Sequence, residues 1–122
     1  MSLLCDAFIH VDTKCVNTGE VAISKKTLVT SFVRTCSVLG FNYKGNNFLA
    51  HIDALDPNMK LKIINKLNIL NPQYIKEIKI WKGSACNSNC PSFQLAKEIV
   101  SNLSGKVIYY QAKENLIKIS HY

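Results

Sequence analysis

Residues 30–53 read TSFVRTCSVLGFNYKGNNFLAHID, and this stretch decides the fold that the sequence predicts. Two runs rich in apolar residues, 36–43 and 47–53, flank a short segment at 44–46 that is typical of a turn. Apolar runs separated by a few residues that include a glycine indicate a β-hairpin. We therefore expect two antiparallel strands here, joined by a tight loop at Gly45.

One cysteine and one histidine lie at the open end of this predicted hairpin. Cys36 begins the first arm, and His51 lies near the end of the second. Because the two strands of an antiparallel pair run side by side, the pairing brings these two residues close together. The sequence thus raises the question whether Cys36 and His51 are a nucleophile and its base or two ordinary strand residues.

The rest of the chain carries signals for both helices and strands. Asp56 and Pro57 predict the start of one helix, as its N-cap and first helical residue. Pro91 opens a second helix, which ends near Gly105. Further strands are expected over residues 4–11, 20–23, 27–33, 75–81, 106–111 and 115–120, the last two as a hairpin. This order predicts an α+β fold: a layered α/β sandwich of largely antiparallel strands with two helices packed on the sheet.

Length and composition indicate an ordinary globular domain. The chain has 122 residues, of which 48% are hydrophobic and 19% charged. No apolar run approaches the roughly 20 residues that a membrane span needs. The first residues lack the basic start of a signal peptide. We therefore expect a cytoplasmic protein with no membrane partner.

The net charge of +7 admits an acidic protein surface or a nucleic acid as a partner. The lysines are scattered along the chain, however, and Arg34 is the single arginine. Arginine is the preferred reader of bases and the bidentate clamp for phosphate. This composition argues against a nucleic-acid-binding protein and favours a protein partner, for which an acidic surface is suitable.

The five cysteines are an odd number, and without a signal peptide reduced thiols are the default. Cys86 and Cys90 form a C-x-x-x-C segment with no second ligand pair close by, whereas structural zinc needs four ligands. We expect no metal and no organic cofactor. We expect free thiols at Cys86 and Cys90 in a surface loop, with a disulfide between them only after oxidation.

The chemistry open to Cys36 and His51 is nucleophilic catalysis. An imidazole can take the proton of a thiol and return it to a leaving group, while a third polar residue holds the other ring nitrogen. The alternative is that both are core residues, because cysteine is among the most buried residue types. His10 and His121 are competing histidines, and His121 lies at the chain end.

The segment VTSFVRTCSVLGFNYKGNNFLAHID resembles the catalytic segment of the CheD-type deamidases. This superfamily includes a chemoreceptor glutamine deamidase, the protein N-terminal asparagine amidohydrolases and several deamidating toxins. Its pattern is a threonine in a strand, a cysteine after a short turn, and a histidine ending a second hydrophobic strand. The order of elements downstream, including a glycine turn at Gly83, also resembles CheD, which implies a single CheD-like domain over residues 1–122.

The resemblance implies a role for each matching position. Cys36 would be the nucleophile, and His51 the general base and acid. Thr30 would orient the imidazole, although Asp53, two residues after His51 on the same strand face, is an alternative orienter or a substrate contact. The loop that starts at Gly83 and Ser84 would line the site and bind substrate, and its two cysteines could be substrate contacts or plain surface residues.

Two positions depart from the pattern of the family. Thr35 and Arg34 precede the cysteine where CheD-like chains favour a tight Gly-Ser turn. The backbone N–H of Cys36 is a candidate donor to an oxyanion, and a bulky turn could alter that donor or the mouth of the site.

The resemblance implies a cysteine-dependent deamidase that hydrolyses a Gln or Asn side-chain amide of a protein substrate. Two alternatives stay open. One is a binding module on the same fold with an inert Cys36, and the other is a basic nucleic-acid-binding protein. The sequence does not separate Gln from Asn, or an internal from an N-terminal site, and it gives no oligomeric state. A viral or effector protein acting in a host cytosol would also fit.

Overall fold

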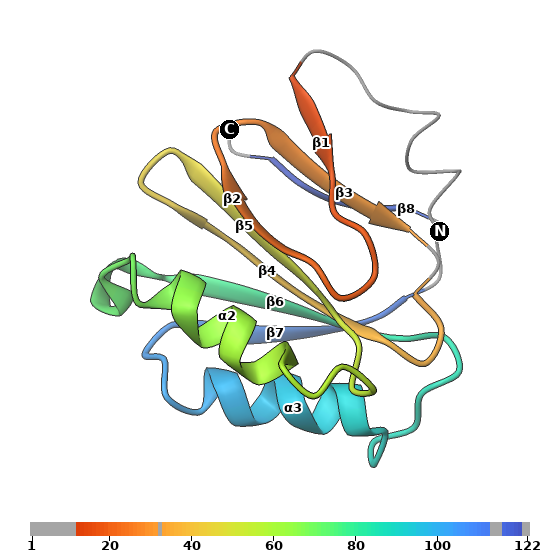
Figure 1. Cartoon of the computed structure of the whole chain (residues 1–122). Helices are drawn as coiled ribbons and strands as arrows, with labels where there is room; N and C mark the ends of the chain where they lie inside the picture. The colour runs from red at the N-terminus through yellow and green to blue at the C-terminus, as the bar shows by residue number, and fades with distance from the viewer. Residues whose placement is uncertain (1–11, 32, 113–115, 121–122) are drawn as a thin grey trace.

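The computed structural model describes residues 12–31, 33–112 and 116–120. In these ranges the fold is mixed α+β, and the elements follow one another along the chain as in Figure 1. The strands are β1 (Thr13–Cys15), β2 (Val21–Ser24), β3 (Thr27–Ser31), β4 (Ser37–Tyr43), β5 (Asn46–Ile52), β6 (Glu77–Lys82), β7 (Lys106–Gln111) and β8 (Leu116–Ile119). The helices are α2 (Met59–Leu67) and α3 (Pro91–Val100), with a short 3-10 turn, η1 (Pro72–Tyr74). The strand expected at 4–11 lies outside the described residues.

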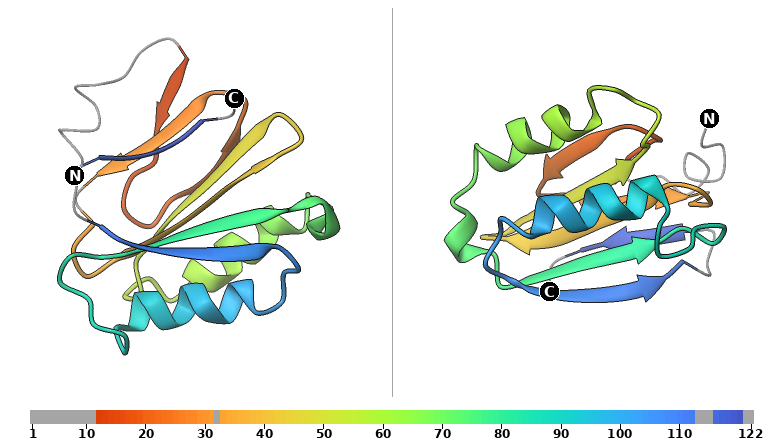
Figure 2. Two further views of the ribbon diagram at one scale, coloured as in Figure 1. Left: turned by 180° about the vertical axis from the view of Figure 1, so that it is seen from behind. Right: turned by 90° about the horizontal axis from the view of Figure 1, so that it is seen from below.

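The described strands form two sheets, and both helices lie on one side of the larger one. The larger sheet has the order β2-β5-β4-β6-β7, and the smaller one the order β1-β3-β8. Figures 1 and 2 show three layers, with the helices on one face of the larger sheet and the smaller sheet on the other. All pairings are antiparallel except β1 with β3 and β6 with β7. The layered, largely antiparallel α+β arrangement is therefore confirmed.

The predicted hairpin is present, and its loop fixes its register. Lys44 and Gly45 form a two-residue connection, and both have positive φ, of 46° and 81°. Two positive φ values in a two-residue loop are the mark of a type I′ turn, whose twist matches that of paired strands. Tyr43 therefore pairs with Asn46, and the same register continues to Val38 opposite His51.

Each face of the larger sheet buries its own apolar core. The helix-side core contains Leu39, Phe41, Phe48, Ala50 and Ile52 from the hairpin, together with the inner faces of α2 and α3. The inter-sheet core contains Val16, Ala22, Leu28, Val33, Val38, Leu49, Ala112, Ile117 and Ile119. Successive side chains along one strand thus pack into the two cores in turn, as expected for a strand covered on both faces.

Gly40 permits the close approach of the two sheets. A Cβ atom built on Gly40 would lie 2.8 Å from a side-chain carbon of Ile119, which belongs to β8. A side chain at this position would therefore require the side chain of Ile119 to move.

Three local predictions about the helices and the last strands are wrong in detail. Helix α2 begins at Met59 with Asn58 as its N-cap, because the carboxylate of Asp56 accepts a hydrogen bond from Asn58 N and forms a turn before the helix. Strands β7 and β8 do not form a hairpin: β7 pairs with β6, and β8 pairs with β3 in the other sheet. Pro91 does open α3 as predicted, but the helix ends at Val100 rather than near Gly105. Neither described helix is long and apolar enough to cross a membrane.

Candidate active site

The hairpin register places Cys36 and His51 on one face of the larger sheet. Val38 lies opposite His51, and its side chain belongs to the inter-sheet core. Cys36 comes two residues before Val38 and packs against the same core. Residues two apart on a strand share a face, so Cys36 and His51 are diagonal neighbours across the hairpin. Cys36 and His51 thus share one face of the sheet, with His51 directly opposite Val38 rather than Cys36.

Thr30 reaches this face from the smaller sheet. Its Oγ1 lies 2.6 Å from Nδ1 of His51, and both residues are buried. Strand β3 therefore supplies a hydrogen-bond partner for the imidazole from across the inter-sheet core. The sequence leaves Thr30 and Asp53 open as the residue that orients the imidazole. In the structure, Thr30 forms the hydrogen bond to the ring nitrogen.

The second ring nitrogen of His51 is left without a partner. His51 Nε2 is buried and makes no hydrogen bond to any described residue, Cys36 included. Buried polar atoms without partners are rare in native structures, and they concentrate where a ligand or a reaction uses them. If Nδ1–H donates to the hydroxyl of Thr30, Nε2 carries the lone pair that a base requires.

Burial keeps both groups in their neutral forms. Burial first, and then the negative charge of Asp53, raise the pKa of the Cys36 thiol from 9.0 to about 11. Burial lowers the pKa of the His51 imidazole from 6.5 to about 4, against the smaller opposite effect of the Asp53 carboxylate. At neutral pH the resting site therefore holds a thiol and a neutral imidazole rather than an ion pair.

Asp53 lies beside both groups without bonding to the imidazole. It follows His51 by two residues, and it extends the register to the position opposite Cys36. One carboxylate oxygen accepts a hydrogen bond from the backbone N–H of Leu55, 3.0 Å away. Asp53 thus acts on the pair through its charge, and its carboxylate is held by the turn that follows β5.

Gly83 brings the loop between β6 and α3 against the turn that carries Cys36. A Cβ on Gly83 would lie 2.0 Å from the carbonyl oxygen of Arg34 and 2.2 Å from that of Cys36, so only glycine fits. Ser84 N donates to Val33 O, and Ala85 N donates to Arg34 O. Gly83 and Ser84, predicted as substrate contacts, are therefore seen to support the backbone of the cysteine turn.

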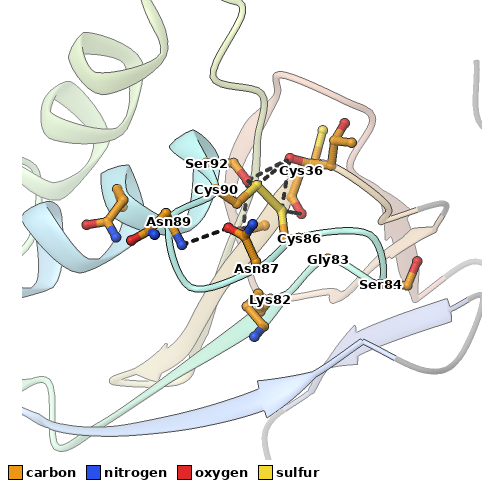
Figure 3. Close-up of a disulfide and its surroundings, with 12 residues drawn as sticks. Cys36, Lys82, Gly83, Ser84, Cys86, Asn87, Asn89, Cys90 and Ser92 are labelled. Carbon is orange, nitrogen blue, oxygen red and sulfur yellow. Dashed lines mark hydrogen bonds between the residues drawn. A yellow bond between two sulfur atoms is a disulfide. The ribbon is translucent and has the colours of Figure 1, made fainter.

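The prediction of free thiols at Cys86 and Cys90 is wrong, because the two form a disulfide (Figure 3). The turns between them bring their Cα atoms to 5.2 Å, within the range that a disulfide can bridge. Cys15 is also disulfide-bonded. Among the described cysteines, Cys36 is the free thiol.

The carbonyl group of Thr35, just before Cys36, is held from the side of α3. Ser92 Oγ donates a hydrogen bond of 2.8 Å to this oxygen. The sulfur atoms of Cys86 and Cys90 lie 3.3 and 3.4 Å from it. Figure 3 shows the disulfide, Ser92 and Cys36 grouped together at the start of α3. The sequence prediction missed Ser92, and the only signal for it was its place beside Pro91 at a helix start.

No group of three or more His, Cys, Asp or Glu side chains in the described part of the chain is arranged to hold a metal ion. Comparison of the sequence with models of protein families, and with curated proteins, finds no match.

Proposed function

We propose that this protein is a cysteine-dependent deamidase, with Cys36 as nucleophile, His51 as general base and acid, and Thr30 as the residue that orients the imidazole. The observation that carries the proposal is the hydrogen bond between His51 Nδ1 and Thr30 Oγ1, on the sheet face that also carries Cys36. Cys-His hydrolases share this arrangement: a cysteine nucleophile, a histidine that accepts its proton, and a polar group that orients the histidine. The sequence resemblance of residues 29–53 to the catalytic segment of the CheD-type deamidases supports the same assignment.

The reaction would proceed by acyl transfer through a thioester. His51 Nε2 takes the proton of the Cys36 thiol as the sulfur attacks the carbon of a Gln or Asn side-chain amide. The resulting oxyanion collapses, the C–N bond breaks, and the imidazolium gives its proton to the departing ammonia. His51 then takes a proton from water, the hydroxide attacks the thioester, and the thiol is restored as the substrate leaves as a carboxylic acid.

The neutral resting pair determines when the proton moves. With the pKa of Cys36 raised to about 11 and that of His51 lowered to about 4, proton transfer before substrate binding is unfavourable. The transfer must then accompany attack on the amide carbon, as in hydrolases with a neutral serine nucleophile. Neither a metal nor an organic cofactor takes part in this mechanism.

An acidic protein surface is the partner that the charge favours. The net charge is +7, and part of it lines a cavity of about 550 Å³ between the β1–β2 segment and α2. Lys14, Lys62 and Lys66 contribute to the wall of this cavity, and Lys62 is paired with Asp56. Complementary charge of this kind accelerates the encounter with an acidic partner.

The direct test measures deamidation. The purified protein is incubated with a peptide library that presents Gln and Asn at internal and N-terminal positions, and ammonia release and amide-to-acid mass changes are followed. We expect conversion that is lost in Cys36→Ala and in His51→Ala. A library and a cell lysate that both remain unchanged by the wild-type protein would overturn the proposal.

One observation favours a second candidate, an inert binding module on this fold. His51 is only 1% exposed, and the pKa of the Cys36 thiol is raised rather than lowered. Structural cysteines are buried and inert in this way. For this candidate, Cys36→Ala would retain every binding partner of the wild-type protein while no substrate is converted by either.

A further inference from the structure

Three polar groups form a buried chain behind the cysteine turn. Ser37 Oγ lies 3.0 Å from Ser92 Oγ, and Ser92 Oγ lies 2.8 Å from the carbonyl oxygen of Thr35. Both serine side chains are fully buried, on the helix side of the larger sheet. A buried hydroxyl group is costly unless it is hydrogen-bonded, so this arrangement specifies one geometry.

The direction of each hydrogen bond in the chain follows from the groups involved. A carbonyl oxygen only accepts, so the single proton of the Ser92 hydroxyl points to Thr35. The hydroxyl of Ser37 must therefore donate to Ser92. Within this chain, Ser92 thus donates the hydrogen bond to the Thr35 carbonyl. Ser37 contacts Ser92 and not the carbonyl.

The held carbonyl also determines the direction of the next N–H group. The peptide unit between Thr35 and Cys36 is planar and trans, so its C=O and N–H bonds point in opposite directions. The carbonyl points to Ser92, toward α3. The N–H of Cys36 therefore points away from α3, toward the side on which Cys36 packs against the inter-sheet core. His51 lies on the same face of the sheet, opposite Val38. This N–H donates to no described backbone carbonyl.

We propose that Ser92 is a positioning residue: by holding the Thr35 carbonyl, it aims the backbone N–H of Cys36 at the oxyanion that forms when the thiol attacks a carbonyl carbon. The inference rests on the proposed nucleophilic role of Cys36, but not on the identity of the amide substrate. An N–H aimed in advance stabilises the developing charge without reorganisation, and removing one such donor costs about 100- to 1,000-fold in rate.

The test compares two electrophiles under non-reducing conditions. Reaction of Cys36 with p-nitrophenyl acetate passes through a tetrahedral oxyanion, whereas alkylation by iodoacetamide forms none. Ser92→Ala should slow acylation about tenfold, since the donor is misaligned rather than removed, and leave the alkylation rate unchanged. Ser37→Ala is the matched control, because it removes a buried hydroxyl from the same chain but keeps the bond from Ser92 to Thr35. Cys36→Ser gives the background in both reactions.

The ratio of the two rates decides the outcome. A ratio that falls in Ser92→Ala and stays near the wild-type value in Ser37→Ala supports the positioning role. An equal loss of both rates, or an unchanged ratio, overturns it. Should Ser92→Ala fail to fold, Ser92→Thr keeps the hydroxyl and must retain the wild-type ratio. A protein that passes this test but converts no amide would leave the positioning role standing while the deamidase proposal fails.

Discussion

The reactivity of the Cys36 thiol should depend on pH in a way that excludes a resting ion pair. The pKa of this thiol is raised from 9.0 to about 11. A thiol whose pKa is raised stays protonated at neutral pH, and only the thiolate is alkylated. Well below both values, a difference of two units leaves about a hundredfold less thiolate than in an unperturbed cysteine. We therefore expect Cys36 to react with iodoacetamide about a hundredfold more slowly than a free cysteine peptide at pH 8.

The assay follows alkylation from pH 6 to pH 10 without reductant, with peptide mapping to assign the label to Cys36. The rate should rise about tenfold per pH unit with no plateau in this range, because the thiol stays mostly protonated below its raised pKa. His51→Ala should change the rate little, since the pKa of the imidazole is lowered to about 4 and the ring carries no charge above pH 6. A plateau between pH 6 and pH 8 that disappears in His51→Ala would refute the reasoning, because it would reveal a thiolate–imidazolium pair.

Three further predictions concern stability. The pKa of His51 is lowered from 6.5 to about 4 in the folded state, so the unfolded chain binds a proton at higher pH than the folded protein does. The free energy of unfolding should therefore fall by about 3 kcal/mol as the pH drops from 6.5 to 4. Urea titrations should show this fall in the wild-type protein and not in His51→Gln. Thr30→Val leaves the buried Nδ1 of His51 unpaired and should cost about 1–3 kcal/mol by denaturant unfolding, whereas Thr30→Ser should recover most of it. Gly83→Ala drives a methyl group into the carbonyl oxygens of Arg34 and Cys36 and should lower the free energy of unfolding by at least about 3 kcal/mol; a wild-type Tm would contradict the tight contact.

The hairpin could be predicted from sequence because its signals are local. Lys44 and Gly45 adopt the positive φ values that this two-residue turn requires, and an apolar run lies on either side of it. The turn then sets the register, so the neighbourhood of Cys36 and His51 follows from residues that are close along the chain. Thr30 was placed at the imidazole by resemblance, and the side-chain contact is present in the structure.

The features that sequence reasoning missed depend on contacts between distant segments. Strand β8 pairs with β3 in the smaller sheet and not with β7, which precedes it in the chain. This pairing buries Ile117 and Ile119 in the inter-sheet core. Ser92 meets the Thr35 carbonyl only because Gly83 allows two loops to touch, although the residues lie 57 positions apart. Neither pairing has a signature in a window of neighbouring residues, because packing rather than local propensity decides it.

The neutral site has a consequence for how any activity of this protein can be found. Enzymes that use a preformed thiolate reveal their nucleophile to any small electrophile. In the proposed mechanism the proton stays on Cys36 until the thiol attacks a carbonyl carbon, and the N–H of Cys36 has its full effect on the oxyanion that then forms. Thiol reactivity therefore measures the ground state, whereas the proposed activity depends on groups that act in the transition state. A slow alkylation rate is thus expected of the proposed deamidase and of the inert binding module alike, and conversion of a carboxamide substrate is the measurement that separates them.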